Sequence, residues 1–286
     1  MNNKINVLVT GANGQLGNEL KELSKNCPEL DFKFTDVEEL DITSLKEVEH
    51  FFNINSFHFC VNCAAYTAVD KAEEDKEKAQ LINVTSSEYL AKVTANHEIK
   101  YIHISTDFVF SGEKNRPYLE DDHTLPVSVY GLTKLSGEKM ALDNNEETII
   151  IRTSWLYSSH GNNFVKTMLR LSESKKELSV IFDQIGTPTY AHDLAKAIID
   201  IILSGKFESG MFHYSNEGVA SWYDFAKMIF EEKGINIKVN PISTEAFPTP
   251  AKRPPYSVMS KEKIKNTYRL EIPYWRDSLR KCLNKL

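Results

Sequence analysis

Tyr130 and Lys134 have the side chains and the spacing to handle a proton on a bound ligand. Side chains four positions apart on a helix share one face, so this phenol and this ammonium can meet around a single molecule. A nearby cation lowers the pKa of a tyrosine from ~10, and the phenol then becomes a usable proton donor near neutral pH. The pair follows a strand-like segment that ends in Ser105, Thr106 and Asp107. Spacing and position together predict a site of acid/base chemistry.

A second Tyr-x-x-x-Lys pattern, Tyr223 with Lys227, shows that the spacing alone is weak evidence. It comes late in the chain and directly follows Ser221 and Trp222, with Asp224 placed where a helix start would have an acid. An ordinary helix accounts for this copy without any chemistry. We therefore assign a function only to the pair at 130 and 134.

A glycine-rich turn near the N-terminus is typical of a phosphate-binding loop. Gly11, Gly14 and Gly17 follow an apolar, β-branched run at residues 5–10, and a helical pattern begins at about Gln15. Glycine lets the backbone turn tightly and approach a pyrophosphate, whose charge then meets the N–H groups at the helix N-terminus. The spacing is G-x-x-G-x-x-G rather than the general G-x-G-x-x-G. In this strand–turn–helix context we predict a dinucleotide site.

Asp36 closes the second predicted strand, about 20 residues after the glycines, where a dinucleotide site has an acid. Its carboxylate can accept both hydroxyls of an adenosine ribose and would repel a 2′-phosphate. This favours NADH, although one carboxylate does not exclude NADPH. Asp41 and Ile42 follow shortly and are placed to contact the adenine.

These residues need a scaffold of alternating strands and helices, and the sequence has that pattern. Strands are predicted at residues 5–10, 32–35, 57–62, 101–105 and 148–153, with helices at about 15–24, 44–55, 75–96 and 129–142. Continuously apolar strands separated by helices indicate βαβ units and a parallel sheet covered on both faces. The predicted fold class is α/β, a Rossmann-type doubly wound parallel sheet with a smaller C-terminal α/β substrate-binding cap.

Beyond Trp155 the pattern is looser. Helices are predicted near 163–172, 192–203 and 221–233 and from about 275, and short strands near 178–182, 211–214 and 238–242. We predict a dinucleotide-binding domain over residues 1–154 and a cap over residues 155–286, with some helices of the cap packing back on the sheet.

Composition excludes several classes of protein. With 286 residues, 41% apolar and 26% charged, the chain has enough core to fold on its own. A net charge of −6 opposes binding to nucleic acid or to an anionic membrane. Cys60 and Cys63 form a C-x-x-C pattern, but within a predicted strand they face opposite sides and have no second pair, so we interpret them as plain thiols. The chain shows no membrane span, signal peptide or histidine-based metal pattern, and we expect a soluble, cytoplasmic protein.

Together these residues resemble the extended short-chain dehydrogenase/reductase superfamily. Within it, the resemblance is to the dTDP-4-dehydrorhamnose reductases, and it covers nearly the whole chain. The segments that carry this narrower resemblance are Asn62–Glu73, Ser105–Phe110, Arg152–Tyr157, Gly161–Phe164, Asp183–Thr189 and Pro248–Pro254.

The resemblance implies a reduction of the 4-keto group of dTDP-4-dehydro-L-rhamnose to give dTDP-L-rhamnose, with hydride from NADH or NADPH. It implies that Tyr130 is the proton donor, that Thr106 hydrogen-bonds the same oxygen and that Lys134 binds the nicotinamide ribose. Asp107 and Trp155 would orient the sugar, and Arg253 is the candidate for the diphosphate. The implied cofactor contacts are Gly11, Gly14, Gln15, Leu16, Asp36, Asp41, Ile42, Ala65, Tyr66, Thr67, Tyr130 and Lys134.

Other functions stay open at this point. A dehydratase of the superfamily would have a second acid where Phe108 follows Asp107, which argues against elimination of water. A related keto-sugar-nucleotide reductase or an epimerase is an alternative. So is a non-catalytic regulatory subunit like that of methionine adenosyltransferase, which turnover would distinguish. Some such reductases hold Mg²⁺ between subunits. Glu19 lies where one acid would be, but His192 replaces another, so the resemblance leaves a homodimer possible and a metal bridge doubtful.

Overall fold

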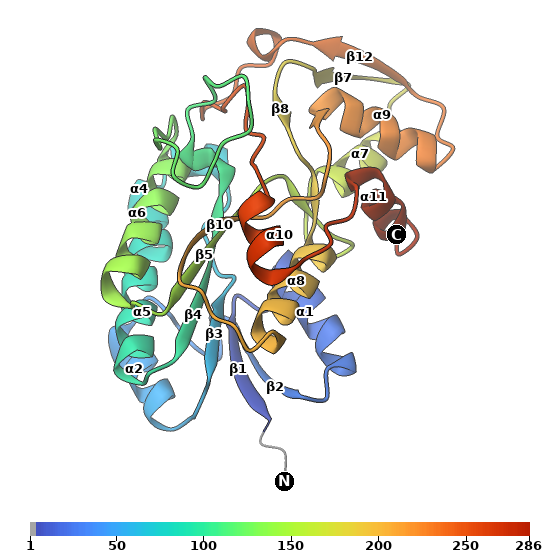
Figure 1. Ribbon diagram of the computed structural model, residues 1–286. Helices are drawn as coiled ribbons and strands as arrows, with labels where there is room; N and C mark the ends of the chain where they lie inside the picture. The colour runs from blue at the N-terminus through green and yellow to red at the C-terminus, as the bar shows by residue number, and fades with distance from the viewer. Residues whose placement is uncertain (1–3) are drawn as a thin grey trace.

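The computed structural model describes residues 4–286 and has a six-stranded, fully parallel sheet at its centre (Figure 1). In spatial order its strands are β2 (Leu30–Thr35), β1 (Ile5–Thr10), β3 (Phe59–Asn62), β4 (Lys100–Thr106), β5 (Thr148–Thr153) and β10 (Gly210–His213). All residues of β3 and β5 are buried, as expected for strands covered on both faces. The predicted α/β class with a parallel sheet is confirmed.

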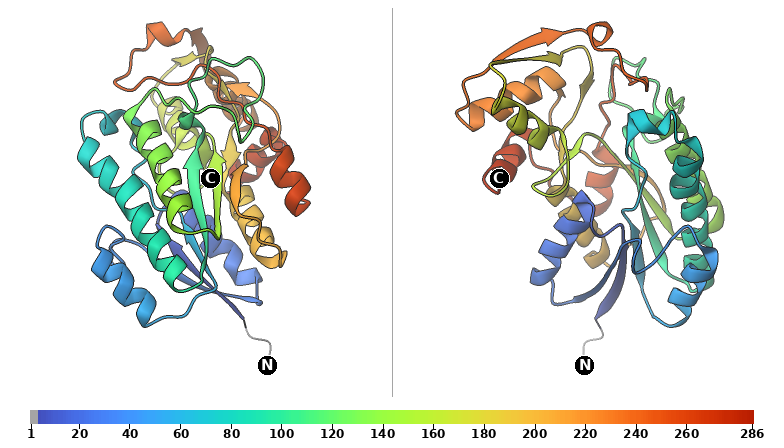
Figure 2. Two further views of the ribbon diagram at one scale, coloured as in Figure 1. Left: turned by 60° about the vertical axis from the view of Figure 1, so that its left-hand side comes forward. Right: turned by 180° about the vertical axis from the view of Figure 1, so that it is seen from behind.

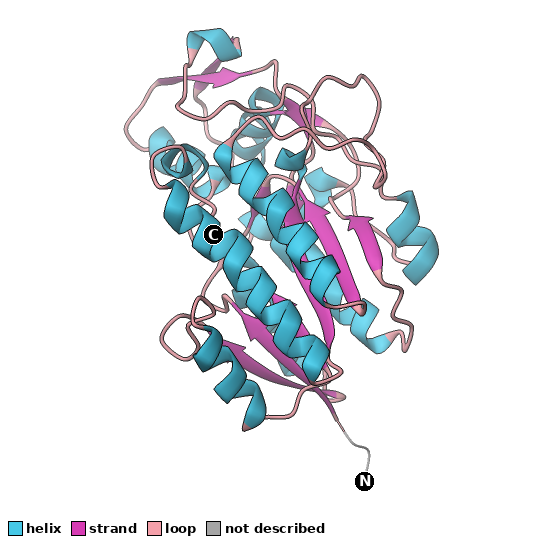
Figure 3. Ribbon diagram, turned by 90° about the vertical axis from the view of Figure 1, so that its left-hand side faces the viewer, coloured by secondary structure: helices cyan, strands magenta, loops and turns pink. Residues whose placement is uncertain are grey.

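Helices cover both faces of this sheet (Figure 2). One layer contains α2 (Leu45–Asn53), α5 (Ser86–Asn96) and α6 (Val129–Asn144), and Figure 3 shows its long helices in front of the strands. The other layer contains α1 (Gln15–Leu23), α8 (Ala191–Leu203) and α10 (Glu262–Tyr268). Alternation along β4 directs Tyr101 to the first layer and Ile102 to the second, so each face has its own apolar core.

The predicted elements exist, and their ends differ by up to two residues. The exception is the helix predicted over 75–96. There the structure has α3 (Val69–Ala72) before it, then α4 (Lys76–Gln80), a π-helical turn at Leu81–Thr85 and α5. A π turn adds a residue to the helical repeat and often occurs at functional sites. The π turn places Asn83 toward α6. Position 137 of α6 has no room for a side chain, because a Cβ added to Gly137 would lie 2.1 Å from the Asn83 carbonyl oxygen.

The later part of the chain forms a smaller layer above the carboxyl ends of the strands (Figure 1). Its core is formed mainly by α7 (Phe164–Ser172), α9 (Trp222–Glu232) and α11 (Trp275–Leu283), beside the paired strands β7 (Glu177–Ile181) and β12 (Lys238–Ile242). Two short ladders complete it, β6 (Leu156–Tyr157) with β9 (Thr189–Tyr190) and β8 (Ile185–Gly186) with β11 (Ala220–Ser221). Strand β10 and helices α8 and α10 return to the central sheet, and the division of the chain at residue 154 stays a prediction.

Across residues 4–286, none of the helices combines the length and the apolar character that crossing a bilayer requires.

Candidate active site

The glycine-rich turn lies where the strand order of the sheet reverses, between β1 and β3. Ligands of open α/β sheets bind in the crevice at such a point. Gly11 has φ of 66°, and a Cβ added there would lie 2.5 Å from the backbone nitrogen of Ala64, which follows β3. Only glycine accommodates both the positive φ and the close approach to Ala64. The turn therefore packs against the loop after β3 and begins α1 with Gly14 as its N-cap.

Two cavities adjoin at this crevice. The larger has a volume of about 560 Å³ and the smaller about 400 Å³, and both are lined by Gly11, Gly14, Cys63 and Ala65. Because they share these residues, they form one groove at the carboxyl edge of the sheet. The predicted residues on the larger cavity are Gly11, Gly14, Gln15, Leu16, Ala65, Thr67, Thr106, Asp107, Tyr130, Lys134, Trp155 and Arg253. Those on the smaller one are Gly11, Gly14, Asp36, Asp41, Ile42 and Ala65.

Tyr66 is the predicted residue that lines neither cavity. Its hydroxyl donates to Asp75, and its backbone N–H donates to the Asn83 side chain at 2.8 Å. The Asn83 amide in turn donates to the Tyr66 carbonyl and to Thr133 of α6. Tyr66 thus contributes backbone that fixes the loop after β3, while its neighbours Ala65 and Thr67 face the groove.

Tyr130 stands in the first turn of α6, which Ser128 caps by accepting a hydrogen bond from the Gly131 N–H. Its ring meets Phe108 edge to face at 5.5 Å. Burial raises the pKa of Tyr130 to about 12, while its hydrogen bond with Thr106 acts in the opposite direction. The expectation that the pKa of Tyr130 is lowered beside Lys134 is therefore wrong for the net shift, which is upward. The cost of burying a phenolate dominates, and the ammonium makes its hydrogen bond elsewhere.

Lys134 is almost fully buried and is held by β4. Its Nζ donates to the Ile104 carbonyl oxygen at 2.7 Å and lies 3.4 Å from Nε2 of His103. Burial lowers the pKa of Lys134 to about 8, against the nearby carboxylate of Glu138, which raises it. An ammonium with a pKa this close to neutrality can exchange a proton during a reaction cycle.

Asp107 shares a buried corner with the Tyr130 phenol. Its Oδ1 accepts a hydrogen bond from Thr106 at 3.1 Å. Burial raises the pKa of Asp107 to about 6, despite hydrogen bonds from Ser257 and Thr106 that favour the carboxylate. The negative charge in turn adds to the upward shift of the Tyr130 pKa.

Trp155 has a strained backbone and is clamped by aromatic contacts. Its φ is 47°, uncommon outside glycine, and an added Cβ at Gly186 would lie 2.7 Å from its indole. The indole of Trp222 stacks on that of Trp155 with 3.6 Å between ring centroids. Trp222 lines the larger cavity and was not predicted as a site residue, because its helical spacing is that of a core helix. Backbone strain of this kind is concentrated at functional sites.

Arg253 reaches the cavity from the Pro-rich loop and is already paired. Its Nη1 and Nη2 donate to Oδ1 and Oδ2 of Asp70 at 3.1 and 2.7 Å, and Nη1 also donates to Thr249. The guanidinium holds the pKa of Asp70 below its usual range. The pair joins two segments about 180 residues apart, so the positive charge predicted for a diphosphate is balanced locally by a carboxylate.

Asp36 has both its carboxylate oxygens near backbone N–H groups. Oδ2 accepts from Asn13 in the glycine turn at 2.8 Å, and Oδ1 accepts from Val37 at 2.9 Å. Each oxygen keeps a second lone pair for a ligand hydroxyl. Glu39 was not among the predicted residues; it accepts from the Asp36 N–H at 2.9 Å and adds a second negative charge next to Asp36.

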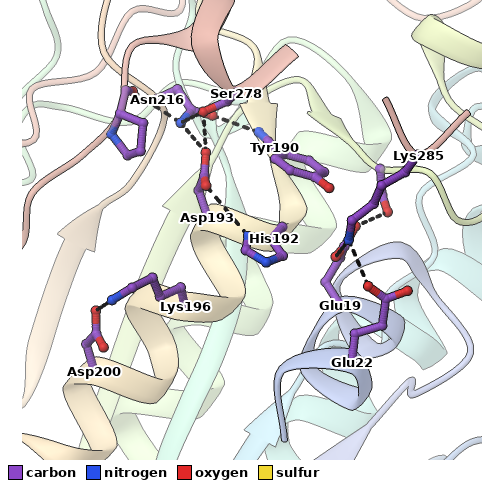
Figure 4. Close-up of polar contacts among 12 residues, drawn as sticks. Glu19, Glu22, Tyr190, His192, Asp193, Lys196, Asp200, Asn216, Ser278 and Lys285 are labelled. Atoms are coloured by element: carbon purple, nitrogen blue, oxygen red, sulfur yellow. Dashed lines mark hydrogen bonds and ion pairs between the residues drawn. The ribbon is translucent and has the colours of Figure 1, made fainter. Parts of the chain in front are cut away.

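Glu19, the acid considered for Mg²⁺, and its neighbour Glu22 lie on α1, in the helix layer opposite to that of α6 (Figure 4). Within residues 4–286, one group of three possible ligands is found, Glu19, Glu22 and His160, with atoms within 4.8 Å of one another. Lys285 Nζ lies 2.8 Å from Glu22 and 3.6 Å from Glu19, and His192 is directed at Asp193 instead. A divalent cation would have to displace the ammonium, so these residues do not fit Mg²⁺ as they stand.

The fold and the groove define a class of protein, a Rossmann-type NAD(P)-dependent oxidoreductase with a Tyr-x-x-x-Lys pair. The profile described as the RmlD substrate binding domain matches residues 5–286. The chain belongs to this family, that of the dTDP-4-dehydrorhamnose reductases.

Similar proteins agree with this membership. The dTDP-4-dehydrorhamnose reductase of Escherichia coli (strain K12) is 41% identical, over 99% of this chain and 98% of the relative. A Bacillus subtilis spore coat polysaccharide biosynthesis protein is 40% identical, over 98% and 97%. The crystal structure of a dTDP-4-dehydrorhamnose reductase from Bacillus anthracis in complex with NADP is 38% identical, covers 99% of this chain and 100% of that one, and has a TM-score of 0.95.

Proposed function

We propose that the protein reduces the 4-keto group of dTDP-4-dehydro-L-rhamnose to the alcohol of dTDP-L-rhamnose, with NAD(P)H as the reductant. One observation carries the proposal: Tyr130, Thr106 and Trp155 line the same cavity as Lys134 and the glycine turn. A proton donor therefore faces the space in which a nicotinamide and a sugar could meet. The names of the relatives supply the identity of that sugar.

Different side chains of the groove serve different steps of a carbonyl reduction. When bound, NAD(P)H supplies hydride to the carbonyl carbon, and negative charge then develops on the oxygen. Tyr130 is protonated at neutral pH, since its pKa is about 12, and gives its Oη proton to that oxygen. General acid catalysis of this kind contributes typically about 10²–10⁴-fold. Thr106 hydrogen-bonds the same oxygen and stabilises the charge.

Lys134 stabilises the phenolate that Tyr130 becomes after giving up its proton. Its ammonium lies one helical turn further along α6 and lines the same cavity, from which it can also bind ribose hydroxyls. Asp107 and Trp155 orient the sugar. Arg253 approaches the diphosphate as part of its pair with Asp70, so it acts chiefly through its remaining N–H groups.

We propose that NADH is preferred and that NADPH is also accepted. Asp36 lines the smaller cavity, and Glu39 adds negative charge behind it by accepting from the Asp36 N–H, so a 2′-phosphate beside Asp36 is disfavoured. A relative has been crystallised with NADP, so the family fold accommodates that cofactor. The cytoplasm as the location and a homodimer as the assembly remain part of this proposal, and gel filtration with light scattering tests the latter.

The experiment that tests the function is turnover by the purified protein. dTDP-4-dehydrorhamnose is supplied with NADH and, separately, with NADPH, and the loss of NAD(P)H absorbance is followed. The product sugar is then identified by NMR. We expect dTDP-L-rhamnose. A protein that binds NAD(P)H but never oxidises it would instead be a binding subunit, and a C4 epimer of the expected product would indicate a related keto-sugar reductase.

A further inference from the structure

Lys134 has a buried neighbour to which the proposed reaction assigns no role. His103 lies on β4, is fully buried, and brings Nε2 to 3.4 Å from Lys134 Nζ. The second acceptor near this ammonium is the Ile104 carbonyl oxygen at 2.7 Å. An ammonium has three N–H groups, so one remains after these two contacts. Because Lys134 lines the larger cavity, the two acceptors fix the direction in which that third N–H is offered to a ligand.

The far side of the imidazole ring is held by two polar side chains. Asn62 Nδ2 lies 3.2 Å from His103 Nδ1 and donates to Tyr101 Oη at 3.0 Å, and Tyr101 Oη is itself 3.2 Å from Nδ1. The oxygen and nitrogen of the Asn62 amide cannot exchange places, because the oxygen accepts from Thr10 Oγ1 at 2.7 Å and from the Ala64 N–H at 3.1 Å. A buried polar chain thus runs from the residue before the glycine turn, through β3 and β4, to α6.

The hydrogen positions of this chain depend on the charge of Lys134. Burial and the neighbouring ammonium hold the pKa of His103 well below its usual range, so the ring is neutral. A charged ammonium only donates, which requires a lone pair on Nε2 and the hydrogen on Nδ1, directed at Tyr101 Oη. A neutral amine at Lys134 can accept from Nε2–H, and Nδ1 then accepts from Asn62 or Tyr101. The tautomer of His103 is therefore coupled to the charge of Lys134.

We propose that His103 is a positioning residue for Lys134: its neutral ring accepts a hydrogen bond from the ammonium, and Asn62 and Tyr101 hold the ring in place. The inference rests on the proposed function and assigns a role within the same reaction. Burying an ammonium is costly unless its N–H groups have acceptors. His103 supplies one of the two, so it keeps Lys134 protonated and directed while Tyr130 gives up its proton.

Other titratable groups lie around Lys134, and all of them keep their side chains when residue 103 is replaced. They are Glu138 and Tyr130 on α6, Cys63 after β3, Asp107 after β4, Tyr101 beside His103 and, through its ion pair with Glu138, Arg152 on β5. Tyr101 also loses its contact with the ring, so a shift in the pH profile that leucine causes and glutamine reverses is the one to assign to the lost acceptor.

The test compares the pH profiles of kcat for His103→Leu and His103→Gln with that of the wild type. Activity falls at high pH when Lys134 loses its proton, near its pKa of about 8. Leucine offers no acceptor, so we expect the alkaline limb to move down by about one pH unit, a tenfold loss of proton affinity. The KM for NAD(P)H rises as well. Glutamine has an amide oxygen that can accept, and it should restore most of the shift.

His213→Leu is the matched control. His213 is also a fully buried, neutral histidine of the central sheet, with its pKa lowered to about 3, and no hydrogen bond joins its ring to a lysine within residues 4–286. Its loss should lower stability and leave the alkaline limb in place. If His103→Leu does not fold, Tyr101→Phe, which removes the hydroxyl behind the ring, should give a smaller shift in the same direction.

A folded His103→Leu protein with the wild-type alkaline limb, or Leu and Gln variants with equal shifts, would overturn the role of His103. A wild-type protein without turnover overturns the proposed function instead. In that case the pH dependence of NAD(P)H binding, which needs no turnover, decides the role of His103 by the same comparison.

Discussion

The indole rings of Trp155 and Trp222 lie face to face, 3.6 Å between centroids and 7° from parallel, across the wall of the larger cavity. Trp155 follows β5 of the central sheet, and Trp222 begins α9 of the smaller layer. Both rings pack on the apolar core of the smaller layer, so the stack attaches the segment after β5 to that layer at the site. It also supports the strained backbone of Trp155, whose φ is 47°.

Trp222→Ala should therefore weaken sugar-nucleotide binding without disturbing the cofactor. An aromatic pair contributes about 0.5–1.5 kcal/mol beyond its buried area, so we expect KM for the sugar nucleotide to rise by up to about tenfold. The KM for NADH should stay unchanged. Trp222→Phe keeps a ring in the stack and should recover most of the affinity. Equal KM values for the Ala variant and the wild type would mean that the stack does not shape the sugar site.

Tyr130→Phe removes the proposed proton donor and little else, since the ring keeps its contact with Phe108. We expect kcat to fall by about 10²–10⁴ while the dissociation constant of NADH barely changes. The control is Tyr223→Phe, the tyrosine of the second Tyr-x-x-x-Lys pattern, which should turn over at the wild-type rate. Stopped-flow measurement of NADH oxidation and fluorescence titration of NADH separate the two quantities. Near-wild-type turnover by Tyr130→Phe would remove its role as the acid.

Asp36→Asn tests the cofactor preference better than Asp36→Ala. The amide keeps an oxygen that can accept from the Asn13 or Val37 N–H, so it preserves much of the glycine turn while removing the charge. We expect the ratio of kcat/KM for NADH to that for NADPH to fall by about tenfold, the effect of 1.4 kcal/mol. Glu39→Gln should change the ratio in the same direction and by less. A ratio unaffected by either change would show that neither carboxylate selects the cofactor.

Asp107 should lower stability at neutral pH. Its pKa is about 6 in the folded protein, against 3.8 as the ordinary value, so the folded state binds the proton more tightly than the unfolded state. The free energy of unfolding therefore falls as pH rises from about 4 to 6 and stays lower above that window, by about 3 kcal/mol at most. Asp107→Asn should melt at a higher temperature than the wild type at pH 8 and lose that advantage near pH 3. A higher KM for the sugar nucleotide in the same variant would mark the functional reason for keeping the acid.

The central sheet and the main residues of the groove were predictable because local patterns determine them. The bounds of β1 and β5 match the prediction, and Ser221 with Asp224 forms the predicted start of an ordinary helix, with both capping hydrogen bonds present. The glycines follow β1, Asp36 follows β2, and Tyr130 lies at the start of α6. In a parallel sheet of this strand order, all three positions lie at the same edge.

What the sequence could not predict depends on contacts between distant segments. The stack of Trp222 on Trp155 and the pairing of Arg253 with Asp70 join residues far apart in the chain, and no periodicity encodes them. The pKa of Tyr130 was predicted with the wrong sign because spacing shows the nearby lysine but does not show burial. The π turn that places Asn83 is set by packing against α6, and it looks like ordinary helix in the sequence.

Because of Lys285, we expect that neither the stability nor the activity of the protein depends on divalent cations. Its ammonium lies beside Glu19, which is fully buried, and Glu22, so the charge that Mg²⁺ would supply is already present (Figure 4). We expect wild-type Tm and turnover to be unchanged by EDTA or by added Mg²⁺.

Lys285→Met leaves the buried Glu19 carboxylate without its ion-pair partner. Because the lysine is more than a third exposed, the loss should be about 1 kcal/mol, or about 2–4 °C in Tm, and Mg²⁺ should now restore part of it. Lys281→Met, four residues earlier on α11 and absent from the ion pairs of Glu19 and Glu22, is the control and should show no response to Mg²⁺. A wild-type Tm that rises with Mg²⁺ as much as that of Lys285→Met would mean that the ammonium does not replace the ion.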